Sequence, residues 1–312
     1  MNYRYFTCLF LVVFVISCKT QNTSQKNTEA AVVSTAYYLN TSALLEDVEI
    51  LSSDAYEGRR TGTNGAALAQ EYIVERFAQL GVHPLGSGYL QSFTFQAGKT
   101  YHAANVLALI PGTSNTKEYI ILSAHYDHEG IQNGEIYNGA DDDASGIAAL
   151  IAFAEYFKEN PPKHSVILAA VDAEELGLVG SKYFVENSII PIENIKLNIN
   201  MDMISRSDKN QLYAVGSKYY KHLEAPIKNT IPYGNLQLRI GHDGSDKLDD
   251  WTYASDHASF HKAGIPFIYF GVEDHKDYHQ PTDDYKNIHP DFYKNAVHTI
   301  LAVFQKLDTM QL

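Results

Sequence analysis

Short apolar runs alternate with amphipathic segments along most of the chain, and this alternation predicts strands and helices in turn. The expected strands are residues 93–95, 105–110, 119–124, 166–171, 195–201, 211–215 and 265–270, with 211–215 at an edge of the sheet. The expected helices are residues 41–53, 66–80, 144–157, 181–186, 218–228 and 291–307. Such alternation indicates an α/β fold, a three-layer sandwich in which helices cover both faces of a mainly parallel central sheet. Residues 236–251 follow neither period.

The first residues have the pattern of an export signal. Arg4 precedes an apolar run over residues 6–16, which is too short to cross a bilayer as a helix. The stretch Val15-Ile16-Ser17-Cys18 resembles the lipobox of bacterial lipoproteins. The expected division is a signal peptide over 1–17, a polar tether over 18–40 and a single domain over 41–312. The resemblance implies a lipid on Cys18 and anchoring in the cell envelope, facing the periplasm or the outside; the alternative is an ordinary signal peptide and a secreted protein.

Composition narrows the classes of partner and site. The 24 basic and 37 acidic residues give a net charge of −13, and no basic stripe offsets it, which argues against a nucleic-acid partner. The only two cysteines, Cys8 and Cys18, precede the expected domain. Any metal site within the domain must therefore use nitrogen and oxygen ligands, and a thiolate-bound structural zinc is excluded.

Side chains of the metal-ligand type follow the expected central strands. They are His125, Glu174 with Glu175, Asp202 and His279, while Asp142 precedes an expected helix. Each alone has an ordinary explanation, such as a solvated acidic turn, a charged helix start or an incidental histidine. Because ligands bind at the carboxyl ends of strands in α/β sheets, we expect these residues to meet. Two histidines, three carboxylates and a spare acid indicate a two-metal hydrolytic centre.

Two further acids have expected supporting roles. Asp127 lies two residues after His125 and is expected to orient that imidazole through its other ring nitrogen. Glu174 stands beside Glu175, so one acid can bind metal while the other transfers a proton.

The chain resembles the co-catalytic di-zinc aminopeptidases of the bacterial leucyl aminopeptidase and aminopeptidase Y type over residues 51–284. The resemblance is carried by His125-Tyr126-Asp127, residues 139–146 and 174–181, Met201-Asp202-Met203, Ser255-Asp256-His257 and Tyr278-His279. It implies two Zn²⁺ ions, bridged by Asp142 and completed by His125 with Asp202 and by Glu175 with His279. It also implies a metal-bound water between the ions, Glu174 as general base, and a cis peptide bond between Asp142 and Asp143.

The resemblance implies peptide substrates that are cleaved at the N-terminus, with a less defined pocket. Ser255 and Asp256 are expected in the pocket wall or at a helix N-terminus, and Tyr253 as a stabiliser of the oxyanion. Arg206 either binds a substrate carboxylate or forms an ion pair, and Arg59 is expected to be structural.

The alternatives to a di-zinc peptidase are a glutaminyl cyclase-like enzyme with one zinc and an inactive surface binding module of the same fold. A count of the bound metal ions separates the cyclase from the di-zinc peptidase.

Overall fold

The computed structural model describes Met1 and residues 39–312. The expected lipidation at Cys18 and almost all of the expected leader and tether lie outside the described residues. Within the described part, no helix combines the length and the apolar character that crossing a bilayer requires.

A nine-stranded sheet forms the centre of residues 39–312, with the strand order β1-β3-β7-β4-β8-β11-β9-β10 and β2 paired to β3. Its strands are β1 (His83–Pro84), β2 (Leu90–Ala97), β3 (Lys99–Ile110), β4 (Asn115–His125), β7 (His164–Val171), β8 (Ile195–Met201), β9 (Gln211–Val215), β10 (Gln237–Ile240) and β11 (Phe267–Gly271). A separate hairpin pairs β5 (Gly130–Gln132) with β6 (Glu135–Tyr137). The four central strands β7, β4, β8 and β11 run parallel, so their carboxyl ends share one edge.

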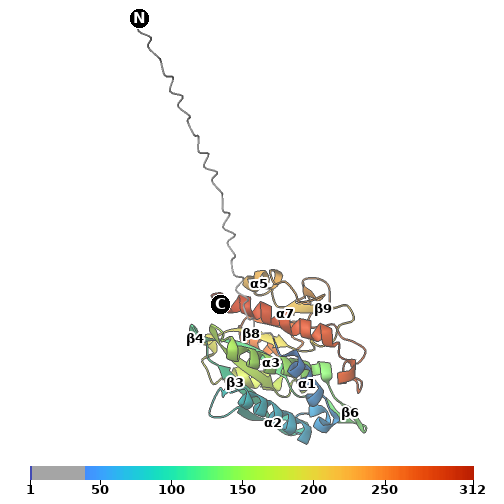
Figure 1. The fold of residues 1–312 in the computed structure, drawn as a ribbon. Coiled ribbons are helices and arrows are strands. Elements are labelled where there is room, and N and C mark those ends of the chain that lie inside the picture. The colour runs from blue at the N-terminus through green and yellow to red at the C-terminus, as the bar shows by residue number, and fades with distance from the viewer. Residues whose placement is uncertain (2–38) are drawn as a thin grey trace. The chain divides into compact units, whose positions relative to one another are not determined.

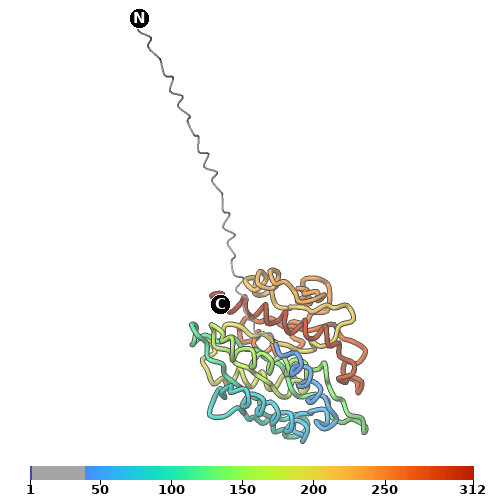
Figure 2. The backbone as a smooth tube through the Cα atoms, viewed as in Figure 1, coloured from blue at the N-terminus to red at the C-terminus, as the bar shows by residue number. Residues whose placement is uncertain are grey.

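Helices cover both faces of this sheet, which confirms the predicted α/β sandwich. One face carries α1 (Thr41–Leu51), α2 (Asn64–Gln79), α3 (Ser145–Glu159) and α7 (Pro290–Asp308), as Figure 1 shows. The other face carries α4 (Val179–Glu186) and α6 (His257–Lys262). The path of the backbone in Figure 2 places the red α7 beside the green α3, where the rings of Phe157 and Phe304 have centroids 5.0 Å apart.

The central strands are mostly apolar where both of their faces are buried. Every residue of β7 is buried, as expected for a parallel strand between two helical layers. Alternate side chains enter different layers: Ile120 and Leu122 of β4 pack under α3, whereas Ile121 lies in the cluster with Phe184 and Phe260. The polar side chains inside these strands, such as Asn198 and Asn200, are buried and hydrogen-bonded to neighbouring side chains.

Two expectations for the segment after β8 are wrong. Strand β9 is not at the edge, because β10, which falls in the unassigned stretch, pairs with it in parallel. The helix expected over 218–228 is reduced to a short 3-10 turn, Lys221–Leu223, followed by α5 (Glu224–Lys228). Pro226 explains the break, because inside a longer helix its ring would clash with the carbonyl group four residues earlier.

Arg59 holds together the loops that follow the sheet edge. It ends the 3-10 segment Asp54–Arg59, and its guanidinium is fully buried. It donates to the carbonyl oxygens of Leu51 (2.7 Å), Tyr126 (2.8 Å), Asn138 (2.5 Å) and Gly139 (2.8 Å). Because buried carbonyl groups without donors are costly, this side chain fixes the loop after β4 against the loop before α3.

We expect Arg59→Met to lower the free energy of unfolding by at least about 3 kcal/mol, because four buried carbonyl groups lose their donor. Urea denaturation followed by circular dichroism measures the loss. The matched control is Arg60→Met, which removes a partly exposed pair with Glu129 at 3.0 Å and is expected to cost about 1 kcal/mol or less. Equal losses in the two variants would show that Arg59 has no special structural role.

Candidate metal centre

The ends of the parallel strands bring the predicted ligand-type side chains to one place. His125 is the last residue of β4, Asp202 follows β8 directly, and Glu174 and Glu175 follow β7. His279 comes from the loop after β11. Together with Asp142, from the short turn Ala140–Ala144 before α3, they form one cluster of buried or partly buried groups.

Asp142 lies between two groups of possible ligands. Its Oδ1 is 3.1 Å from Nε2 of His125, and its Oδ2 is 3.1 Å from Nε2 of His279. On the first side, Asp202 Oδ1 lies 3.5 Å from the same His125 nitrogen. On the second side, Glu175 Oε2 lies 3.3 Å from the same His279 nitrogen. The two oxygens of one carboxylate therefore face two different sets of nitrogen and oxygen donors.

The three successive acids at positions 141–143 have different partners, which explains why only the middle one faces the centre. Asp141 accepts hydrogen bonds from the backbone N–H (2.6 Å) and the hydroxyl (2.7 Å) of Ser205. Asp143 accepts from the N–H groups of Gly146 (2.9 Å) and His125 (3.2 Å). Asp142 is left with histidine nitrogens alone. The peptide bond between Asp142 and Asp143 is cis, as the resemblance implied.

Sequence reasoning missed His128, which belongs to the same cluster. The ring is fully buried, with Nδ1 2.9 Å from Glu175 Oε1 and 3.6 Å from Asp142 Oδ2. Neither ring nitrogen has a partner at hydrogen-bonding angles among the described residues, and neither has Glu175 Oε1. The available clue was its place three residues after His125, in the same loop at the end of β4. Glu129, also missed, has an oxygen close to ligand atoms of Glu175 and His279.

The donor set fits divalent cations of the zinc type. It contains imidazole nitrogens and carboxylate oxygens, which are common zinc ligands, in three overlapping groups, each with its ligand atoms within 4.8 Å of one another. The unpartnered nitrogens of His128 and the unpartnered oxygen of Glu175 also indicate a missing positive partner, because buried polar atoms are normally satisfied.

The protonation behaviour of the two adjacent glutamates differs. Burial raises the pKa of the Glu174 carboxyl well above its usual value, and the charges of Asp256 and Asp202 add to the effect. Burial and Asp142 also act to raise the pKa of Glu175, but contacts with His128 and His279 outweigh them and lower it to about 2. Glu175 is therefore an anion that suits a cation, whereas Glu174 retains a high affinity for a proton.

Asp127 supports the cluster differently from the prediction. Nδ1 of His125 faces the backbone carbonyl oxygen of Asp127 at 3.0 Å, and the carboxylate is farther away, at 3.7 Å. The Asp127 carboxylate instead accepts the backbone N–H groups of Glu174 (3.0 Å) and Glu175 (3.3 Å). The expectation that this carboxylate orients His125 is thus wrong in its detail, since it mainly fixes the backbone of the glutamate pair.

A cavity of about 70 Å³ opens onto the cluster, and the predicted pocket residues are not among those that line it. Tyr253 is 56% exposed and packs on His261, so it lies outside the cavity. Arg206 forms a buried ion pair with Asp277, the second of its two expected roles. The cavity wall has other aromatic side chains, Trp251, Tyr269 and Tyr278.

Ser255 and Asp256 are buried behind the cavity. The Ser255 hydroxyl accepts a hydrogen bond from the Asn200 amide at 2.8 Å. Asp256 occupies the N-cap position of α6, as the second expectation placed it, but its carboxylate makes no capping hydrogen bond there. Burial raises the pKa of Asp256 to about 7. In the loop that precedes them, Trp251 stacks on His242, with ring centroids 3.5 Å apart.

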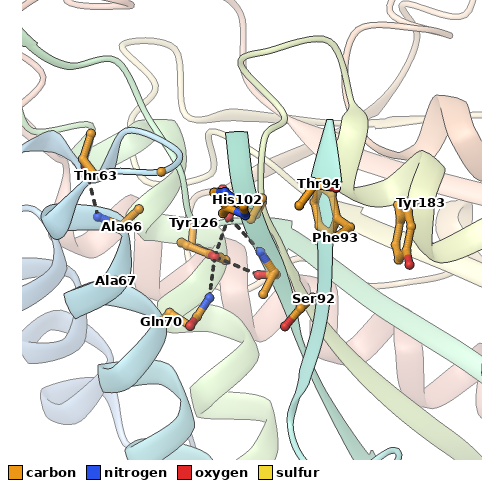
Figure 3. A pocket seen from close by; sticks show the side chains of 14 residues that line it. Thr63, Ala66, Ala67, Gln70, Ser92, Phe93, Thr94, His102, Tyr126 and Tyr183 are labelled. Atoms are coloured by element: carbon orange, nitrogen blue, oxygen red, sulfur yellow. Dashed lines mark hydrogen bonds between the residues drawn. The ribbon is translucent and has the colours of Figure 1, made fainter. Parts of the chain in front are cut away.

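A larger cavity of about 650 Å³, not expected from the sequence, lies between α2 and strands β2 and β3 (Figure 3). Its wall includes Tyr126, whose hydroxyl lies 2.8 Å from Asp172 and 3.2 Å from the Gln70 amide. Thr61 lies 2.9 Å from Asp172 and 3.1 Å from Asp127. Hydrogen bonds thus connect this wall to the carboxylate that holds the glutamate pair.

The buried acids predict an unusual pH dependence of stability for the metal-free protein. Burial raises the pKa of Asp172 and Asp256 to about 7 and that of Asp283 to about 6, above the value near 4 in an unfolded chain. The folded state therefore binds protons more tightly, and the stability that they provide is present at low pH and lost as pH rises through about 6 to 7. Between pH 5 and pH 8 we expect a loss of at least about 2 kcal/mol.

Urea denaturation in a chelator at several pH values measures this loss. The control is the same series with excess Zn²⁺, in which the loss should shrink or reverse because metal binding favours deprotonated ligands. A metal-free protein that gains stability from pH 5 to pH 8 would contradict the assignment of raised pKa values.

Comparisons with known proteins agree with this geometry. The chain is 27% identical over 227 residues to aminopeptidase YwaD of Bacillus subtilis, covering 68% of this chain and 45% of the relative. Among solved structures, a Zn-dependent exopeptidase of Parabacteroides distasonis has a TM-score of 0.69 at 18% identity, covering 86% of this chain and 99% of that one. A glutaminyl cyclase of Porphyromonas gingivalis has a TM-score of 0.70 at 17% identity, with the same coverage. At these identities the structural likeness shows the fold alone.

The comparisons cover different shares of this chain and of its relatives. The chain spans about a fifth to about half of several curated relatives, among them proteins named as zinc metalloproteases. The family model, however, matches residues 105–304, which contain every predicted metal ligand. The chain therefore belongs to Peptidase family M28.

Proposed function

We propose that the protein is a zinc-dependent aminopeptidase with two metal ions, which removes single residues from the N-termini of peptides. The observation that carries the proposal is the position of Asp142, whose two oxygens lie 3.1 Å from two different histidines. A shared carboxylate between two donor sets is what a pair of co-catalytic ions requires. Membership of Peptidase family M28 supports the same reaction class.

Each ion has three protein ligands in this proposal. His125, Asp142 and Asp202 hold the first, and Asp142, Glu175 and His279 hold the second. Zinc ions bound there polarise a carbonyl oxygen and lower the pKa of water. His128 lies against the second set, with Nδ1 2.9 Å from Glu175 Oε1 but not at hydrogen-bonding angles, and it forms a further group of possible ligands with Asp142 and Glu175.

Glu174 is the proposed general base. Its side chain lines the cavity beside His125, Asp142 and Asp202, and its backbone N–H is held by Asp127. Burial raises the pKa of Glu174, which favours transfer of a proton from the attacking water to this carboxylate and then to the leaving amine. Because Glu175 is an anion, the adjacent acids divide the tasks of proton transfer and metal binding.

The charge of the cavity favours the amino end of a peptide over the carboxyl end. No lysine or arginine is among the described residues that line it, and Arg206 is committed to Asp277. A carboxypeptidase needs a cation for the terminal carboxylate of its substrate, whereas carboxylates suit a terminal ammonium group. The small volume, about 70 Å³, also supports an enzyme that acts on a chain end.

A glutaminyl cyclase-like enzyme with one zinc remains the second candidate, since solved cyclases share the fold. The complete second donor set, Glu175 and His279 facing Asp142, favours the peptidase. The deciding experiment measures zinc per chain and the products from free, blocked and glutamine-initiated peptides. About two zinc ions with residue release from free peptides only supports the proposal; one zinc with ring closure of N-terminal glutamine supports the cyclase. Binding of these peptides without turnover would indicate a catalytically inactive surface binding module.

Attachment to the cell envelope through a lipid on Cys18 is part of the proposal. Support for it comes from the sequence alone, namely the apolar run over residues 6–16 and the Val15-Ile16-Ser17-Cys18 stretch.

We expect Glu174→Gln to keep its metal and to lose at least about 100-fold in kcat, because the amide cannot accept the proton from water. Steady-state hydrolysis of an aminoacyl amide measures turnover, and elemental analysis measures metal content. Wild-type turnover in the metal-replete variant would remove Glu174 from the general-base role. Loss of metal would instead assign it to the ligands.

We expect Asp142→Asn to lose most of both ions, since the neutral amide replaces the shared carboxylate. The comparison variant is Asp202→Asn, whose side chain belongs to the first donor set only, so it should keep about one ion per chain. Zinc titration by calorimetry counts the sites, and circular dichroism verifies folding. Two normal sites in Asp142→Asn would refute the bridging role.

A further inference from the structure

Asp274 places an uncommitted negative charge at the rim of the small cavity. It follows β11 by three residues, its side chain is exposed, and it lines both this cavity and an adjoining one. Within residues 39–312 it forms no hydrogen bond and no ion pair. Its charge is therefore available to a group that enters from solvent.

Three cationic side chains on this side of the molecule already have acidic partners. Arg206 pairs with Asp277, and Lys209 pairs with Glu273 at 2.8 Å. Nε2 of His275 lies 2.9 Å from Asp141. Lys276, two residues after Asp274, is exposed and forms no ion pair among the described residues, but it does not line the small cavity and is not paired with Asp274.

Apolar side chains line part of the wall between this rim and the candidate centre. Met203, Trp251 and Val272 line the cavity together with Asp274. A carboxylate beyond an apolar and aromatic surface matches a lysine or arginine side chain, whose aliphatic part packs on the wall while the charged end reaches the acid. The net charge of −13 also attracts cationic substrates.

We propose that Asp274 makes this enzyme prefer peptides whose N-terminal residue is lysine or arginine. The inference rests on the proposed aminopeptidase function and names its substrate class. The terminal ammonium group is attached close to the scissile carbonyl and must stay among the buried carboxylates of the centre. Asp274, in contrast, lies at the solvent-facing rim, where only a longer side chain reaches it.

The test compares kcat/KM for lysyl, arginyl and norleucyl amides of one fluorogenic amine. Norleucine matches the aliphatic part of lysine without the charge. We expect wild type to prefer lysine over norleucine by about fivefold or more, the scale of a rim-exposed charge pair. Asp274→Asn should bring this ratio close to one, and Asp274→Lys should make the glutamyl amide better than the lysyl amide.

The matched control is Asp208→Asn, which removes the same charge from the adjoining cavity but not from the cavity of the candidate centre. It should leave the lysine-to-norleucine ratio unchanged. An equal change in Asp208→Asn would reveal a general field effect and overturn the assignment. An Asp274→Asn variant that slows both substrates equally would also overturn it, because Asp274 would then bind the terminal ammonium group.

The same assay distinguishes failure of the proposed aminopeptidase function from failure of the proposed role of Asp274. If zinc-loaded wild type releases no residue from any free peptide, the aminopeptidase function fails and this inference fails with it. If it hydrolyses norleucyl and lysyl amides equally well, the function stands and the role of Asp274 is refuted.

Discussion

The structure depends on a concentration of negative charge at one edge of the sheet. Asp142, Glu174, Glu175 and Asp202 meet there with little exposure to water, and Asp143 and Asp256 are buried behind them. Carboxylates so close together and so little hydrated repel one another and lose solvation, which the raised pKa values of Glu174, Asp202 and Asp256 reflect. A fold can hold such a cluster if its acids bind protons, if it supplies donors and positive groups, or if it binds metal cations.

The protein supplies part of this compensation through backbone N–H groups. Asp283 accepts from the N–H groups of Asp141 (3.0 Å) and Asp142 (3.1 Å), and Asp127 does the same for the glutamate pair. These bonds fix the backbone at each ligand while leaving the side chains of Asp142 and Glu175 for the centre. The compensation is incomplete, since His128 and Glu175 keep buried atoms without partners. The buried negative charge that is not compensated by the protein is the physical reason to expect metal ions.

The sequence predicts the positions of the ligands better than it predicts the pocket. His125 ends β4 and Asp202 follows β8, and the apolar stretches and parallel pairing of these two strands determine the position of both residues. Tyr253 lies in a loop without period, and its direction depends on packing between residues far apart, such as Trp251 on His242. His128 was missed for a related reason, because nothing in its local pattern distinguishes a buried loop histidine from an exposed one. Strand β10 and the break at Pro226 likewise depend on pairing and sterics that a hydrophobic period does not report.

The hydrogen bonds of Arg59 to four backbone carbonyl groups connect distant parts of the chain, and this affects the order in which the protein folds. Its bonds join residues up to 80 positions apart, and the bond from Asp141 to Asp283 spans 142 positions. Contacts of such long range are slow to form, since the chain between them must be ordered first. The centre can therefore be completed only late, after the sheet and the C-terminal half of the chain are in place. A chain that is still being synthesised therefore has no assembled site with which to bind metal ions or cleave other peptides.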